Sequence, residues 1–222
     1  MSKVLPWSFS SLNAYEQCPR RYNITRIQKL LKEPQTESTL HGNEVHKALE
    51  LGLKGEQVLP KKYAQWEPLV QRIRKAPGKK LVEYKFALTK GFRATEFFAK
   101  DAWVRGVIDA AVLGVKTATV LDWKTGKPKF DTDQLKLFAG VTLAAYPYLE
   151  SVNTGYVWLA HNRVDNKIFT KADVPGIWQE FIPRVQRMER SLEKDDWPPK
   201  PSGLCKSWCP VGRKLCEFCG VD

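Results

Sequence analysis

The sequence predicts a mixed α/β fold, in which helices flank a central sheet that is mostly antiparallel or mixed. Three observations support this fold class. Apolar residues recur at helical intervals in the first part of the chain, the period changes to two after residue 80, and helical spacing returns after residue 131. With 43% hydrophobic and 27% charged residues, the chain has the ordinary composition of a protein that folds around its own core.

One domain of 222 residues is expected, and it divides into three parts. An N-terminal helical part covers 1–78, a sheet-and-helix catalytic core covers 79–195, and a cysteine-rich tail covers 196–222. The tail contains too much proline, glycine and cysteine to form a helix or a strand.

Three helices are predicted in the N-terminal part. The first covers about 9–21, where serines precede Leu12 and Tyr15 at helical spacing. The second lies in "STLHGNEVHKALELGLK" and carries one apolar stripe of Val45, Leu49 and Leu53, with His46 beside it. The third covers about 63–75, because the proline and glycine at 77 and 78 end the pattern.

Strands dominate the next part. Four consecutive strands are predicted as an antiparallel meander, at 81–89, 93–99, 103–113 and 117–125. A helix at 131–146, a hairpin at 154–161 and 166–172, and a closing helix at 174–194 should follow. An irregularity is expected at Pro183 of that last helix.

The charge balance favours a polyanionic partner. The chain has 36 Lys and Arg against 24 Asp and Glu, a formal net charge of +12. Nucleic acid is the first interpretation, an anionic membrane surface the second, and solubility alone the alternative to both. No apolar run of about 18 residues is present and the N-terminal segment lacks the long apolar stretch typical of a signal peptide, so no membrane association and a cytoplasmic location are expected.

The segment "VLDWKTGKP" places two opposite charges on one predicted strand. Side chains two apart on a strand share a face, so Asp122 and Lys124 should project together while Leu121 and Trp123 point to the other side. The preceding strand carries Asp109 in "GVIDAAVL", and a hairpin between the two strands would bring Asp109 close to Asp122.

Two neighbouring carboxylates repel each other, and a divalent cation resolves that repulsion. Mg²⁺ commonly binds one or two protein carboxylates together with water and substrate phosphate, and Lys124 is placed to hold the nucleophile. This pattern is typical of phosphodiester hydrolysis. The alternative is an exposed ion pair, and Glu83 and Lys85 have the same spacing on another predicted strand.

"GVIDAAVL" followed by "VLDWKTGKP" resembles motifs II and III of the PD-(D/E)XK nuclease superfamily, specifically its RecB-like branch. Three other segments resemble further parts of that branch in the same order. "SFSSLNAYEQCPRRY" is similar to its N-terminal helix, "HGNEVHKALE" to its histidine helix and "QLKLF" to its glutamine motif. The resemblance covers most of the chain and implies the PD-(D/E)XK nuclease core.

The resemblance also implies roles for individual residues. His46, Asp109 and Asp122 would be ligands of Mg²⁺ or Mn²⁺, together with the backbone carbonyl of Trp123, and Lys124 would be the catalytic lysine. Gln134 matches the glutamine that orders the active site and contacts DNA, although Phe138 stands where the motif usually has tyrosine. Glu83 matches a frequent acidic position and would support the ligands from behind. An imidazole ligand favours Mn²⁺ beyond what oxygen ligands alone would.

The five cysteines indicate a second metal centre. Cys205, Cys209, Cys216 and Cys219 crowd the tail, while Cys18 stands alone. A disulfide set is not expected in a reducing compartment. Either tetrahedral zinc on the four tail cysteines or a [4Fe-4S] cluster on four thiolates accounts for the spacing.

The resemblance favours the cluster. Relatives such as the AddB nuclease domain and the small CRISPR-associated nucleases bind a [4Fe-4S] cluster with one N-terminal and three C-terminal cysteines. By that analogy the ligands would be Cys18, Cys205, Cys209 and Cys216, with Cys219 as the alternative ligand and structural Zn²⁺ as the alternative metal.

Cationic and aromatic residues are interleaved in several segments, which suits single-stranded nucleic acid. Arg20, Arg21, Lys127 and Lys129 are the candidates for contacts with the DNA backbone, against the alternative of solvated surface charge.

The prediction is a metal-dependent deoxyribonuclease of a bacterial or phage-infected cell, acting as an exonuclease on single-stranded or frayed DNA ends in recombination, repair or phage DNA processing. A helicase or a recombination or annealing protein is the expected partner. The alternative is a non-catalytic DNA-end-binding protein with a zinc-stapled tail.

Overall fold

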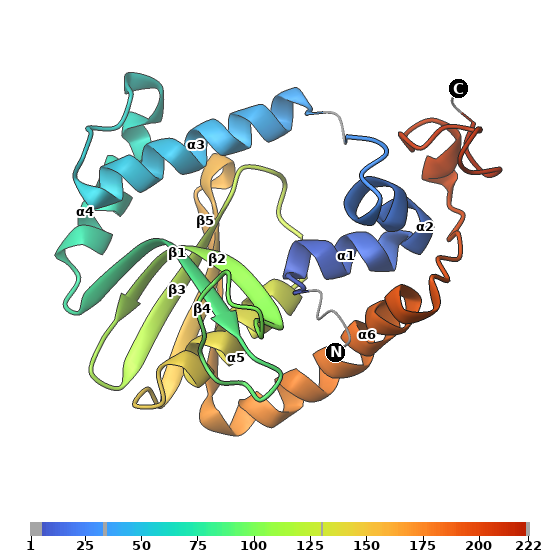
Figure 1. Ribbon diagram of the computed structural model, residues 1–222. Helices are drawn as coiled ribbons and strands as arrows, with labels where there is room; N and C mark the ends of the chain where they lie inside the picture. The colour runs from blue at the N-terminus through green and yellow to red at the C-terminus, as the bar shows by residue number, and fades with distance from the viewer. Residues whose placement is uncertain (1–5, 33–34, 130, 221–222) are drawn as a thin grey trace. The chain divides into compact units, whose positions relative to one another are not determined.

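A computed structural model describes residues 6–32, 35–129 and 131–220 (Figure 1). It contains the helices α1 (Phe9–Gln17), α2 (Pro19–Tyr22), α3 (Glu37–Lys54), α4 (Glu67–Lys75), α5 (Asp133–Ala145) and α6 (Val174–Lys194). The strands are β1 (Lys79–Leu88), β2 (Val104–Leu113), β3 (Thr117–Lys124), β4 (Ser151–Trp158) and β5 (Arg163–Thr170). None of the helices in the described part of the chain combines the length and the apolar character that crossing a membrane requires.

The chain forms two compact units. The sheet unit is Thr36–Trp178 together with Pro6, and it contains α3, α4, α5 and the whole sheet. The cysteine unit is Trp7–Gln35 and Gln179–Asp222, and it contains α1, α2, most of α6 and the tail. The mixed α/β fold class predicted from the sequence is confirmed.

The sheet has the order β1-β2-β3-β4-β5. Strands β3 and β4 are parallel and every other neighbouring pair is antiparallel. A parallel pair requires a crossover connection, and α5 supplies it between β3 and β4. The hairpin predicted from the last two strand patterns corresponds to β4 and β5 and is confirmed.

The strand predicted at 93–99 is wrong. This segment lies in the connection from β1 to β2, where Ala94 forms only an isolated bridge with Leu88. Phe92 has a φ of 57°, and the amide of Phe92 donates to the Thr89 carbonyl, so the chain turns back at once. The alternation of "RATEFFA" therefore reflects turns that are anchored by aromatic side chains, and the predicted meander has three strands instead of four.

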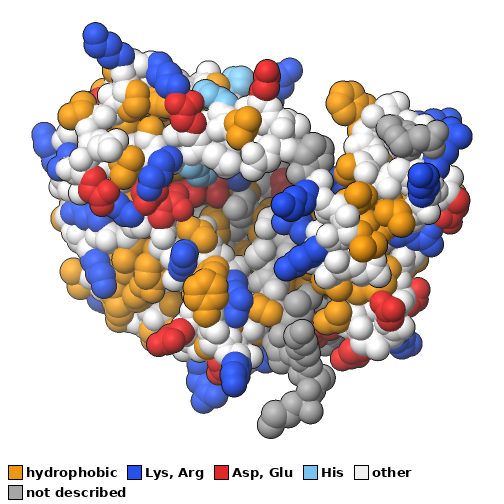
Figure 2. All heavy atoms as spheres, turned by 45° about the horizontal axis from the view of Figure 1, so that its top comes forward, with side chains coloured by type: hydrophobic (Ala, Val, Ile, Leu, Met, Phe, Trp, Pro, Cys, Tyr) orange, Lys and Arg blue, Asp and Glu red, His pale blue; other side chains and the backbone are white. Residues whose placement is uncertain are grey.

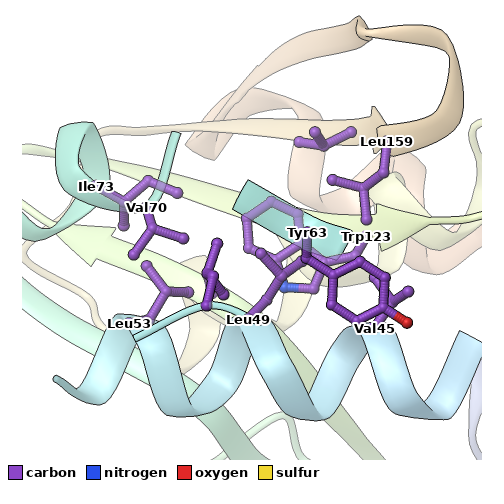
Figure 3. Close-up of a cluster of buried hydrophobic side chains, with 11 residues drawn as sticks. Val45, Leu49, Leu53, Tyr63, Val70, Ile73, Trp123 and Leu159 are labelled. Carbon is purple, nitrogen blue, oxygen red and sulfur yellow. The ribbon is translucent and has the colours of Figure 1, made fainter. Parts of the chain in front are cut away.

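A hydrophobic core joins α3 and α4 to the sheet (Figure 3). From α3 it takes Val45, Leu49 and Leu53, as the sequence stripe predicted. Leu49 and Val45 are fully buried, and Trp123 of β3 packs into the same cluster. This burial holds α3 against Trp123, in the last residues of β3.

Helix α5 buries a different set of side chains. Leu135, Phe138 and Val141 are buried, and the Phe138 ring packs edge-on against Phe86 of β1 with centroids 6.1 Å apart. Aromatic pairs favour this edge-to-face geometry. Phe138 therefore fills an apolar contact in which a tyrosine hydroxyl would need a partner.

The first predicted helix, 9–21, is two helices in the cysteine unit. Cys18 has extended backbone angles (φ −164°, ψ 108°) and separates α1 from α2, because Pro19 disfavours a helical conformation in the residue before it. The helix α6 continues through Pro183, where an irregularity was predicted. Within this unit Trp7 stacks on Phe181, and the Tyr15 hydroxyl donates to the Arg187 carbonyl at 3.0 Å.

Candidate active site

The site lies where β2 and β3 separate. Their ladder runs from Leu113 opposite Ala118 to Ala110 opposite Leu121 and ends there. Asp109 and Asp122 occupy the next positions, so the two residues stand opposite each other just beyond the last paired residues. The peptide groups freed by this separation have side-chain partners instead: the amide of Trp123 donates to Asp109 Oδ2 at 2.7 Å.

His46 joins the two strands from α3. Because Val45 and Leu49 are buried in the core, the neighbouring His46 is directed to β3, where its Nε2 lies 3.1 Å from the Trp123 carbonyl oxygen. Its Nδ1 lies 3.3 Å from Asp109 Oδ1. Burial opposes protonation of this imidazole, but the hydrogen bond to Asp109 and the charges of nearby carboxylates raise its pKa above the ordinary value.

Glu83 completes a three-residue donor group with His46 and Asp109. It lies on β1 at the position that the register places opposite Asp109. Donor atoms of His46, Glu83 and Asp109 all lie within 4.8 Å of one another. Burial and the neighbouring Asp109 charge raise the pKa of the Glu83 carboxyl.

The backbone of Glu83 is strained. Its φ is 50°, in the left-handed region that residues other than glycine seldom occupy in a strand. Such a conformation costs about 1–2 kcal/mol and is often found at functional sites. The sequence predicted Glu83 only as a support behind the ligands, whereas the structure brings its carboxylate among the donor atoms.

Asp122, Lys124 and Gln134 form a closed network. Lys124 Nζ lies 2.6 Å from Asp122 Oδ2 and donates to Gln134 Oε1 at 2.9 Å, while Gln134 Nε2 donates to Asp122 Oδ1 at 2.9 Å. Asp122 and Lys124 thus share a face of β3, and Trp123 points to the core on the other side, as their spacing predicted. Asp122 is 5% exposed, and burial raises the pKa of its carboxyl to about 6 despite the adjacent lysine.

Tyr156 was not singled out from the sequence. It lies beside Asp122 in the parallel β3–β4 ladder, and Lys124 Nζ lies 5.0 Å from the centre of its ring. A cation at this distance is attracted to the ring face. Finding Tyr156 required the parallel register of two strands that are separated by a helix, and no local pattern reports that register.

The donor set fits a small divalent cation. Carboxylate oxygens, a backbone carbonyl and an imidazole are ligands that Mg²⁺ and Mn²⁺ accept. Ligands at about 2.1 Å in neighbouring octahedral positions lie about 3.0 Å apart. The separation of 3.1 Å between His46 Nε2 and the Trp123 oxygen matches that spacing. Asp122 lies outside the 4.8 Å group, since its oxygens bond to Lys124 and Gln134.

A hollow of about 560 Å³ opens over these residues. His46, Glu83, Trp123 and Lys124 line it together with Ser38, Thr39, Gly42, Asn43, Lys47, Glu50, Thr125 and Gly126. Lys127 and Lys129, both predicted to contact DNA, are exposed in the segment that leaves β3. On the face in Figure 2, acidic side chains and a histidine gather among lysines and arginines.

All five cysteines line one cavity of about 400 Å³ in the cysteine unit. Cys216 and Cys219 are buried, and burial together with the neighbouring Cys209 thiol raises the pKa of Cys219 to about 12. Cys205 Sγ accepts a hydrogen bond from the Ser202 amide at 3.3 Å. Arg20 and Arg21 line the same cavity, and the Arg20 guanidinium pairs with Glu217.

Two solved structures resemble this fold. "Crystal structure of SSO0001" aligns with a TM-score of 0.50 at 16% identity, covering 96% of this chain and 86% of that one. A protein from Eubacterium rectale called "Putative exonuclease" aligns with a TM-score of 0.53 at 11% identity, covering 94% and 88%. At these identities the likeness is one of fold. No curated protein matches the sequence.

A family model covers nearly the whole chain. The model for the PD-(D/E)XK nuclease superfamily matches residues 6–217, a span that includes His46, Glu83, Asp109 and the network of Asp122, Lys124 and Gln134. Nucleases of this superfamily depend on divalent metal ions and act on DNA, in agreement with the donor group beside Lys124. The chain therefore belongs to the PD-(D/E)XK nuclease superfamily.

Proposed function

We propose that this protein is an exonuclease that hydrolyses single-stranded DNA from its ends with Mg²⁺ or Mn²⁺. The observation that carries the proposal is that two groups of polar side chains lie next to each other where β2 and β3 separate. The donor group of His46, Glu83 and Asp109 stands on one side, and the ammonium of Lys124 stands on the other, held by Asp122 and Gln134.

The ligands proposed for the cation are His46, Asp109, Asp122 and the Trp123 carbonyl, with Glu83 as a further ligand. The bound cation would neutralise phosphate charge and lower the pKa of a water molecule. Lys124 donates a hydrogen bond to the attacking water and stabilises the developing charge on the phosphate. Gln134 and the Tyr156 ring hold the lysine in place for this role.

The first experiment tests cleavage itself. Wild-type protein, Lys124→Ala and Lys116→Ala are incubated with labelled single-stranded DNA and Mg²⁺ or Mn²⁺. Lys116 is a matched control because it is an exposed lysine that pairs with Glu150 in the same unit. Cleavage by the wild type and by Lys116→Ala, but not by Lys124→Ala, supports the proposal. Binding without metal-dependent cleavage would favour a non-catalytic DNA-end-binding protein.

A second experiment separates exonuclease from endonuclease activity. A linear single strand and a covalently closed circle of the same sequence are compared, with a label at either end of the linear form. An exonuclease degrades only the linear form, and the position of the label that is released first gives its polarity. Degradation of the circle would refute the exonuclease assignment while leaving the nuclease assignment intact.

For the cysteine unit we propose a [4Fe-4S] cluster, with zinc as the alternative metal. The support is that all five cysteine side chains line one cavity, where burial and the neighbouring thiols raise the pKa of Cys219. A metal ion favours the thiolates that such crowding otherwise disfavours. Cys18, Cys209 and Cys216 are proposed ligands, and Cys205 and Cys219 compete for the fourth position.

Iron and zinc contents measured on anaerobically purified protein decide between the two metals. A brown protein with about four iron atoms per chain supports the cluster. A colourless protein with one zinc refutes it. A helicase or a recombination or annealing protein is proposed to supply the single-stranded ends. A pull-down with the tagged protein from the cells that produce it would test for this partner.

A further inference from the structure

The connection between β1 and β2 exposes an aromatic ring between two cations. Phe98 is 78% exposed, and its ring meets that of Phe97 edge-on with centroids 5.0 Å apart. Lys85 Nζ lies 5.7 Å from the Phe97 ring centre and 5.9 Å from that of Phe98. The guanidinium carbon of Arg105 lies 5.5 and 5.8 Å from the same two centres. We call these four residues the Phe98 cluster.

The cluster is rigidly mounted. In the same connection, the rings of Phe92 and Trp103 pack against each other and against Trp178, and the centroids of Phe92 and Trp178 are 4.5 Å apart. Trp103 and Trp178 are buried. Arg105 donates from Nη2 to the Ala99 carbonyl at 3.3 Å, which fixes the guanidinium beside the rings. The exposure of Phe98 is thus a feature of an ordered segment.

No carboxylate in the described part of the chain pairs with either cation. Among the described residues neither Lys85 nor Arg105 forms an ion pair, so their charges remain available to an anion. Cation–π attraction to an exposed ring is worth only about 0.5–1 kcal/mol. That gain does not account for keeping a large apolar side chain almost fully in water.

The cluster is continuous with the active site along two strands. Lys85 is two residues from Glu83 on β1, and Arg105 is four residues from Asp109 on β2. At about 3.3 Å per residue these separations are about 7 and 13 Å. Val107, between Arg105 and Asp109, is 37% exposed, so the surface between them is open.

We propose that the Phe98 cluster binds the single-stranded DNA substrate beside the scissile phosphate, with one base stacked on Phe98 and the flanking phosphates on Lys85 and Arg105. Single strands are bound in this way wherever cations follow the backbone and aromatic rings receive the bases. The net charge of +12 is complementary to this ligand. The proposal rests on the proposed nuclease function for the identity of the ligand, and it adds the place where bases are held.

Binding is measured by fluorescence anisotropy in EDTA, so that no cleavage occurs. The probes are a labelled oligothymidylate and an abasic oligonucleotide of the same length, and the proteins are wild type, Phe98→Ala, Phe98→Trp and Val115→Ala. Val115 is a matched control because it is 88% exposed and apolar in the turn between β2 and β3. Stacking of a base contributes about 1–3 kcal/mol, so Phe98→Ala should weaken oligothymidylate binding about fivefold or more. Phe98→Trp and Val115→Ala should bind as the wild type does.

The abasic probe separates stacking from charge. It should bind Phe98→Ala and wild type equally, and Lys85→Gln should lower the salt dependence of log K by about 0.7 for the lost phosphate contact. Unchanged oligothymidylate affinity of Phe98→Ala would overturn the proposal, as would an equal loss on both probes. Because binding is read without metal, a wild-type protein that never cleaves DNA would refute the nuclease function and leave this result standing.

Discussion

Asp122→Asn should stabilise the metal-free protein at neutral pH while abolishing cleavage. The residue is 5% exposed, and burial raises the pKa of its carboxyl from 3.8 to about 6. At pH 7 the folded protein therefore holds a buried negative charge, and burial makes this charge less favourable than it is in the unfolded chain. Asparagine keeps the shape of the side chain and removes the charge.

The magnitude follows from the two pKa values. A difference of one in pKa corresponds to about 1.4 kcal/mol, so a carboxyl raised from 3.8 to about 6 destabilises the fold by about 3 kcal/mol at pH 7. Asparagine replaces one of the two acceptor oxygens with an NH2 donor that faces Lys124 Nζ or Gln134 Nε2, which costs about 1–2 kcal/mol. We expect a net gain of about 1–2 kcal/mol, which raises the Tm by about 2–8 °C.

The pH dependence has a definite sign. Because the folded state binds the Asp122 proton more tightly than the unfolded state does, the wild type loses stability as pH rises from about 4 to about 6. The gain from Asp122→Asn should therefore be full at pH 7.5 and small at pH 4.5. Calorimetry in EDTA at both pH values measures it. Added Mn²⁺ should reverse the order, since it stabilises only the protein that binds it well.

A carboxyl with the opposite shift provides the control. The Thr170 amide and hydroxyl donate to Asp173 and lower its pKa, so Asp173→Asn should destabilise the protein at pH 7.5. If Asp122→Asn instead lowers the Tm at pH 7.5, or raises it equally at both pH values, the buried charge is not the source of instability and the reasoning is wrong.

Three further outcomes are expected. Glu83→Gly should raise the Tm above that of Glu83→Gln by about 2–4 °C, because glycine relieves the φ of 50°, while both variants bind Mn²⁺ more weakly by calorimetric titration. Leu49→Ala, at a fully buried position, should lower the free energy of unfolding in urea by about 2–5 kcal/mol, and a smaller loss would mean that the core collapses around the cavity. Cys219→Ser should lose more bound metal than Cys205→Ser if the buried cysteine is the fourth ligand, and elemental analysis of both proteins gives the answer.

Most of the sheet follows from local patterns of apolar residues, and β3 shows the clearest one, because buried and more exposed residues alternate along most of it. That alternation correctly placed Asp122 and Lys124 on one face and Trp123 on the other. The segment 93–99 alternates equally well, but it joins β1 only through the Ala94–Leu88 bridge and the bond from the Thr95 amide to the Ala87 carbonyl, and its later residues form turns. Alternation alone does not distinguish a strand from a series of turns in which every second side chain is partly covered.

The position of the Glu83 side chain depends on strand register and on its own backbone conformation, and no short sequence pattern contains either. From the spacing, Glu83 with Lys85 was as good a charge pair as Asp122 with Lys124. In the fold the two pairs differ: Glu83 stands across from Asp109, while Lys85 lies beside Phe97 and Phe98. Strand register and one left-handed residue cause this difference, and both depend on packing across the sheet.

The cysteines show a similar limit. Their spacing indicated a metal centre, but the cavity gathers all five, so spacing cannot select four of them. The choice depends on which sulfurs already have another partner, such as Cys205 with the Ser202 amide.

The backbone of Trp123 matters for how mutations of this site are interpreted. Its amide hydrogen and its carbonyl oxygen both contact functional side chains, Asp109 and His46. Alanine scanning would leave these two atoms in place and report Trp123 only as a packing residue. A backbone ester in place of the Asp122–Trp123 peptide deletes the hydrogen that Asp109 accepts, and an ester in place of the Trp123–Lys124 peptide weakens the oxygen beside His46. The two esters, introduced separately by chemical ligation, would expose contributions that genetics cannot reach.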